Sequence, residues 1–225
     1  PTDATIYGVS TTQYLSYIGY LNKRLLAGHC VWVDDRDIRL LKKYDVKVSH
    51  LAVSNQFLAS GIAPIAKMIN YGVTVGIGTD DCNCNESVNM ISDMKHVALL
   101  QKVKNLDSGA ITSEKVLEMA TIDGAKTVGM ESKIGSIEIG KKADIIIINM
   151  QYPHLKPSHQ VPSTLVYQAN GSEIDTTIID GKILMNNRKL TFMTEKEEEK
   201  IMDEAQKASI RIAEKAGMQF RLKRG

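Results

Sequence analysis

The chain has 225 residues, of which 43% are hydrophobic and 24% are charged, the balance of an ordinary soluble globular protein. Its net charge is only +2 at pH 7 and its positive and negative residues are interspersed, so the sequence predicts no nucleic-acid partner. No apolar run approaches the roughly 18 residues that a membrane-spanning helix requires, so no membrane partner is predicted either.

The cysteines and the first residues bear on location and completeness. The three cysteines, two of them spaced as Cys82-x-Cys84, form neither a disulfide framework nor a CxxC pair, which favours a reducing, cytoplasmic environment. The chain opens with PTDATIYG, without a starting Met or the pattern of a signal peptide. We therefore expect a fragment or a processed chain.

Strand and helix patterns alternate along the first two-thirds of the chain. Apolar runs rich in β-forming residues predict strands over residues 25–33, 46–53 and 73–80. Helical spacing and capping residues (Ser10, Asp35 and Thr112) predict helices over residues 10–21, 35–44, 64–71 and 87–104 and two shorter ones over 113–129. Gly72 is expected to end the third of these helices. The alternation predicts an α/β fold with a parallel sheet covered on both faces.

The pattern changes at about residue 134. From there the sequence alternates and breaks at Gly and Asp-Gly, which predicts antiparallel strands joined by hairpins. A charged amphipathic helix over residues 195–216 closes the chain. We therefore divide the chain into residues 1–133, 134–192 and 193–225.

Each of the three predicted parallel strands ends in polar side chains. His29 ends the first, His50 ends the second with Ser54 and Asn55 just beyond, and Asp80 with Asp81 ends the third. In barrels of strand–helix units, catalytic groups lie at the carboxyl ends of the strands. Imidazole and carboxylate are ligands that a metal hydrolase needs around a water molecule, and a carboxylate can also accept that water's proton. Taken singly, such a His is also typical of a structural hydrogen bonder and such an Asp of a turn or helix cap. The spacing fits a metal hydrolase, but the number of ligands is too small.

Several segments resemble the amidohydrolase superfamily. The segments GHCVW, VSNQFLASGIAPI and GIGTDDCNCNESVNM are similar to the last three strand ends of that superfamily's metal-dependent barrel. Its C-terminal segments are similar to EMATIDGAKTVGM, IGSIEIGKKADIIII and YQANGSEIDTTIIDGKIL. Within the superfamily the chain most resembles the s-triazine hydrolase and melamine deaminase-like branch, near the adenosine-derivative and guanine deaminases. The resemblance implies the C-terminal part of a TIM (β/α)8 barrel, strands six to eight with their helices, plus strands of a small β-sandwich.

The resemblance also implies roles for six residues. Asp80 becomes a metal ligand and the catalytic proton acceptor, and His29 contacts the metal, its water or the substrate. The implied substrate-binding residues are Ser54, Asn55, Asp81 and Cys84. An acid and a thiol at positions 81 and 84 are more similar to the amine-displacing members than to the chlorine-displacing ones. The family's first-strand His-x-His and its fifth-strand His and Glu are absent, so we expect the chain to begin just past the fifth strand.

These observations predict a metal-dependent hydrolase that cleaves a C–N bond. The expected reaction is deamination, or a related hydrolytic displacement, of an aromatic nitrogen heterocycle such as an s-triazine, a purine or a pterin. The expected cofactor is one divalent ion, zinc or alternatively iron, and a homo-oligomer is expected. The alternative is a non-catalytic fragment or binding module that lacks the N-terminal metal ligands.

Three other motifs are weaker. Cys82-x-Cys84 lacks partners for a zinc site, and the cytidine-type deaminase signature does not occur. Gly76-x-Gly78 is followed by Asp81 where a dinucleotide fingerprint needs a third glycine.

Overall fold

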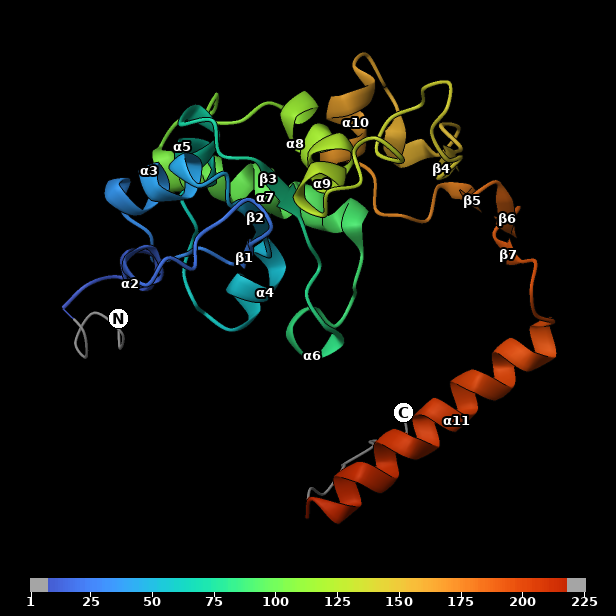
Figure 1. The fold of residues 1–225 in the computed structure, drawn as a ribbon. Coiled ribbons are helices and arrows are strands. Elements are labelled where there is room, and N and C mark those ends of the chain that lie inside the picture. The colour runs from blue at the N-terminus through green and yellow to red at the C-terminus, as the bar shows by residue number, and fades with distance from the viewer. Residues whose placement is uncertain (1–7, 218–225) are drawn as a thin grey trace.

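The computed structural model describes residues 8–217 and contains two β-sheets with helices around the first (Figure 1). The parallel sheet has the order β1-β2-β3 and the antiparallel sheet the order β4-β5-β6-β7. The strands are β1 (Leu26–Gly28), β2 (Lys47–His50), β3 (Val75–Ile77), β4 (Ile145–Ile148), β5 (Ile174–Ile179), β6 (Lys182–Asn186) and β7 (Lys189–Leu190). In Figure 1 the last helix, α11 (Glu195–Lys215), runs apart from both sheets.

The predicted parallel α/β pattern is confirmed for the first sheet. β2 lies in the centre, with Val48 paired to Ala27 of β1 and to Val75 of β3. Its strands are shorter than predicted because the backbone turns soon after each one. His29 and Asp80 have left-handed conformations just past β1 and β3, with φ of 61° and 64°. The polar residues therefore lie beyond the strands rather than within them.

The residues that follow β2 form a helix that the sequence analysis did not predict. Residues 51–53 were expected to continue the strand, but Ala52 begins α4 (Ala52–Phe57). The run LAV has the composition of a strand, whereas the helix depends on tertiary contacts, which propensity does not reflect. A second short helix, α6 (Cys82–Asn85), was also not predicted. Both carry predicted site residues.

The other helices agree with the sequence patterns in kind, with differences at their ends. They are α2 (Thr11–Tyr17), α3 (Asp35–Lys43), α5 (Ile65–Asn70), α7 (Met90–Asn105), α8 (Ser113–Ala120), α9 (Ile122–Thr127), the 3-10 helix η1 (Pro153–Leu155) and α10 (Val161–Tyr167). The predicted cap at Asp35 is wrong, since Asp34 caps α3 in a capping box with Asp37. The long helix predicted from residue 87 begins at Met90, after Asn89 as its cap. Gly72 does follow the end of α5, with φ of 78°.

The core lies around β2 and β3, where α8 and α9 pack closely on the sheet. Val48 and Val75 are buried, and so are Met94, Val97 and Met119 from the helices. Gly76 allows the closest approach, since a Cβ atom there would lie 2.9 Å from the Gly124 Cα of α9. This packing fixes the ends of β2 and β3, on which the candidate site is built.

The C-terminal part is antiparallel, as predicted. Asp180 and Gly181 form the two-residue turn between β5 and β6, and both have positive φ, as Asp-Gly hairpins require. The four strands form one sheet within residues 8–217, and the β-sandwich and the boundaries at residues 133 and 192 stay predictions. Among residues 8–217, no helix combines the length and the apolar character that crossing a membrane requires.

Candidate active site

His29 and Asp80 meet at the carboxyl edge of the parallel sheet. His29 Nε2 lies 3.6 Å from Asp80 Oδ2, and the two side chains are 44% and 22% exposed. They come from the ends of the two outer strands, so the central strand β2 separates their backbones. The structure thus brings together the two side chains that were expected to converge on one ion.

Both residues are held in a strained backbone conformation. Their positive φ angles are uncommon outside glycine and cost on the order of 1–3 kcal/mol where the surrounding structure imposes them. The neighbouring Cys30 also has a positive φ of 47°. Such strain is concentrated at functional sites, because it aims side chains that a regular strand would point elsewhere.

α4 places two buried polar residues, Ser54 and Asn55, behind this pair. Asn55 Oδ1 lies 2.8 Å from His29 Nδ1. Ser54 lies near enough to Asp80 for its hydroxyl to lower the pKa of that carboxyl, although its Oγ has no hydrogen bond of ordinary length. The backbone N–H of Asp81, donating to Asp80 Oδ1 at 2.9 Å, lowers the same pKa further. Asp80 is therefore ionised at neutral pH.

His50, at the end of β2, is buried next to this group. Burial, and then the nearby charge of His29, lowers the pKa of His50 to about 4, so its ring is neutral at pH 7. Neither ring nitrogen has a hydrogen-bond partner among the described residues. The sequence analysis noted His50 at a strand end but assigned it no role.

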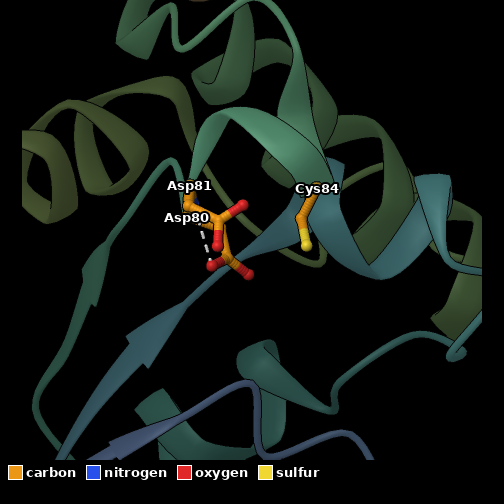
Figure 2. Close-up of side chains that lie close together, drawn as sticks. All are labelled: Asp80, Asp81 and Cys84. Atoms are coloured by element: carbon orange, nitrogen blue, oxygen red, sulfur yellow. Dashed lines mark hydrogen bonds between the residues drawn. The ribbon is translucent and has the colours of Figure 1, made fainter. Parts of the chain in front are cut away.

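The third element of the site is the turn that carries Asp81 and Cys84. Figure 2 shows the carboxylates of Asp80 and Asp81 and the Cys84 thiol pointing toward one another, and their potential ligand atoms lie within 4.8 Å. Asp81 is exposed, and its Oδ1 accepts a hydrogen bond from the Asn83 N–H at 2.8 Å, so it caps α6. The following helix α7 has a cap of its own, Asn89. Burial and then the negative charge of Asp81 raise the pKa of the Cys84 thiol, which keeps it protonated.

A buried pair that sequence reasoning missed supports this turn. Asn85 Nδ2 donates to Asp93 Oδ2 of α7 at 2.9 Å and to the Thr79 carbonyl oxygen at 2.6 Å, next to Asp80. Asp93 is fully buried, and burial raises its pKa to about 6. Its position four residues before Val97, on the apolar face of the predicted helix, was the signal that could have revealed it.

The donor atoms of His29 and Asp80 fit a zinc ion. Zinc binds imidazole nitrogen and carboxylate oxygen at about 2.0–2.2 Å, which puts two ligands of a tetrahedral site about 3.3 Å apart. The observed 3.6 Å is close to this separation. Two ligands are fewer than a zinc site requires, and the protonated Cys84 thiol is a poor third ligand.

The fold and this pair of donors define a class of protein, and the comparison with known families agrees. Residues 3–184 match the Amidohydrolase family, and the chain belongs to that family. Among curated proteins, it is 47% identical over 219 residues to an S-triazine hydrolase of Gordonia rubripertincta, covering 97% of this chain and 46% of the relative. It is 44% identical to a 5'-deoxyadenosine deaminase of Methanosarcina acetivorans, covering 93% and 48%. The chain thus spans about half the length of these relatives.

Solved structures of related enzymes have the same fold as this chain. An adenosine deaminase from Xanthomonas campestris with bound zinc superposes with a TM-score of 0.89 at 32% identity, over 94% of this chain and 48% of that one. An atrazine chlorohydrolase from Arthrobacter aurescens, complexed with zinc, has a TM-score of 0.79 at 22% identity over 85% and 42%, which shows the fold alone. These matches confirm the resemblance to the amidohydrolases and to their triazine hydrolase branch. They imply a fold of the TIM-barrel type.

Proposed function

We propose that the chain forms part of a metal-dependent hydrolase that replaces the exocyclic amine of an aromatic nitrogen heterocycle with a hydroxyl group. The observation that carries the proposal is the pair of His29 Nε2 and Asp80 Oδ2, 3.6 Å apart at the carboxyl edge of a parallel sheet. The relatives named as a triazine hydrolase and a deoxyadenosine deaminase support the substrate class. The substrate itself, and the activity of the whole protein, are part of the proposal.

His29 and Asp80 would hold one divalent ion, for which we propose zinc, with iron as the alternative. When bound, such an ion supplies the acidification of a water molecule, from a pKa of about 16 to about 7. The imidazole of His29 would be held in place for this purpose by its contact with Asn55.

Asp80 would move the proton. Its lowered pKa keeps the carboxylate ionised and able to accept a proton from the attacking water. The oxygen of that water bonds to the ring carbon, the C–N bond breaks, and Asp80 passes the proton to the departing amine. One water is consumed, one ammonia is released, and the ring keeps the oxygen.

Asp81 and Cys84 would recognise the leaving group. A carboxylate accepts hydrogen bonds from an exocyclic NH₂ but meets only lone pairs on a chlorine, so Asp81 favours amine over halide. The raised pKa of Cys84 keeps a neutral thiol beside it. The predicted substrate contact of Ser54 remains a proposal, as do the homo-oligomer and the cytoplasmic location.

The test uses the full-length gene product and a panel of amino-substituted triazines, purines and pterins, each paired with its chloro analogue where one exists. We expect ammonia release from at least one amine, loss of that release after chelation, and its return on adding zinc or iron. No ammonia from any compound, together with a purified protein free of zinc and iron, would favour the non-catalytic binding module.

A further inference from the structure

Asn55 makes a contact that its predicted role in binding substrate does not explain. Its side chain is buried, with 1% of the residue exposed, and its Oδ1 lies 2.8 Å from His29 Nδ1. A residue that lines a pocket would present its amide to the open space at the site. Asn55 instead directs its carbonyl oxygen to the back of the His29 ring.

This contact determines which nitrogen of His29 carries the proton. A carbonyl oxygen only accepts hydrogen bonds, so Nδ1 donates, and in the neutral ring Nε2 then keeps its lone pair. That lone pair faces the Asp80 carboxylate at 3.6 Å, beyond hydrogen-bond length. In that tautomer two electron-pair donors face each other, an arrangement that a cation between them would stabilise.

The backbone holds both partners in this orientation. The His29 N–H donates to the Ser49 carbonyl oxygen of β2 at 3.0 Å. Asn55 is fixed within the first turns of α4, where its N–H donates to the Leu51 carbonyl oxygen at 3.0 Å and its own carbonyl accepts from Ser60 at 2.8 Å. The ring of His29 therefore cannot turn without breaking its partly buried contact with Asn55.

We propose that Asn55 is a positioning residue, which acts through its Oδ1 to keep His29 in the tautomer whose Nε2 can bind a cation together with Asp80. This inference rests on the proposed function only in assigning a cation to His29 and Asp80, and it replaces the substrate contact predicted for Asn55. Mutating a group that holds the second nitrogen of a ligand histidine typically lowers metal affinity or activity by about 10- to 100-fold.

The experiment compares three variants of the full-length gene product. Asn55→Leu keeps the volume and removes the acceptor. Asn55→Asp keeps an acceptor toward Nδ1 and replaces Nδ2, which has no partner among the described residues, with the second oxygen of a carboxyl group. Gln56→Leu, at the exposed neighbour on the same helix, is the control. Zinc affinity is measured by competition with a chromogenic chelator, and kcat and KM with the best amine of the panel.

We expect Asn55→Leu to lose about 10- to 100-fold in zinc affinity and in kcat with little change in KM. Asn55→Asp should keep at least the wild-type zinc affinity, because a carboxylate partner also holds the ring and raises its basicity, and Gln56→Leu should stay near wild type. If Asn55→Asp is as impaired as Asn55→Leu, or if Asn55→Leu raises KM alone, the proposal is wrong. If Asn55→Leu does not fold, Asn55→Ala, which also removes the acceptor, takes its place with the same expected losses. Because zinc affinity needs no substrate, failure of the deaminase proposal would leave this test intact.

Discussion

Asp80 is constrained at three points within a few residues of chain. Its backbone is left-handed, its Oδ1 accepts the Asp81 N–H, and its Oδ2 faces His29. Each constraint acts on a different atom, so the carboxylate has one oxygen fixed and one available. A side chain that must hold a cation and accept a proton requires this division of its two oxygens.

Asp81 combines a structural and a proposed chemical role, which substitutions can separate. Asn caps helices about as well as Asp, so Asp81→Asn keeps the cap of α6 while it removes the negative charge. We expect thermal stability to be unchanged and the rate of ammonia release to fall by about 10- to 100-fold. A hydrogen bond to a charged group contributes about 1.5–3 kcal/mol, and losing it in the transition state would slow the reaction by about that factor.

Asp81→Ala serves as the comparison, because it removes the cap as well and should lose about 1 kcal/mol of stability. Thermal melts and steady-state rates of both variants provide the check. A parallel loss of stability and activity in Asp81→Asn would show that Asp81 acts only as a cap.

At the scale of elements, the turn between β3 and α7 depends on a buried acid. The fully buried Asp93 binds Asn85, which in turn binds the carbonyl oxygen just before Asp80. The hydrogen bond from Asn85 lowers the pKa of Asp93, but burial outweighs it and raises that pKa from 3.8 to about 6. The support of the site therefore depends on pH.

An acid whose pKa is raised by folding stabilises the fold fully below its unfolded pKa and loses that contribution as pH rises through the folded value. For Asp93 this window runs from about pH 4 to about pH 6. Asp93→Asn stays neutral at every pH. We therefore expect its free energy of unfolding, relative to that of wild type, to rise by about 2 kcal/mol as the pH goes from 4.5 to 7.5. Thermal melts across that range measure the difference, with the exposed Asp107→Asn as the control. A difference between wild type and Asp93→Asn that is constant with pH would contradict the prediction.

The contact between β3 and α9 provides a second prediction at this scale. Gly76→Ala would place a Cβ atom 2.9 Å from the Gly124 Cα and 3.0 Å from Thr127 Cγ2, so the helix would have to shift. We expect the free energy of unfolding to fall by about 1–3 kcal/mol, which thermal melting would detect. In Gly28→Ala on β1 the nearest atom lies 3.8 Å away, so this variant should melt near wild type. Equal melting temperatures for the two variants would show that β3 and α9 are not closely packed.

The predictability of these elements follows from the range of the interactions that form them. The parallel sheet was predictable because its strands are apolar runs and its helices have local caps. α4 and α6 were not predictable, since each is short and depends on contacts with other elements. Likewise, His29 and Asp80 were found from their position at strand ends. The bonds of Asn55 to His29 and of Asn85 to Asp93 join residues whose proximity only the fold creates.

For the whole molecule, the main feature is the open parallel sheet. Among residues 8–217, β1 and β3 each pair on one side only, and Leu26 of β1 is 42% exposed. Unpaired strand edges with apolar side chains promote association, and each buried unsatisfied backbone group costs about 1–3 kcal/mol.

We therefore expect these 225 residues, expressed alone, to form oligomers or aggregates and to melt without a sharp transition. Sedimentation velocity and thermal melting of this chain test the expectation. A monodisperse monomer with a cooperative melt would show that the three-stranded sheet needs no further pairing.

The most direct test of the central claim is the position of the metal ion in the full-length gene product. Crystals grown with zinc and measured at the zinc absorption edge should give an anomalous peak about 2.0–2.2 Å from both His29 Nε2 and Asp80 Oδ2. The same peak should be lost in Asp80→Asn. A zinc ion bound elsewhere, or a peak that survives in that variant, would contradict the account.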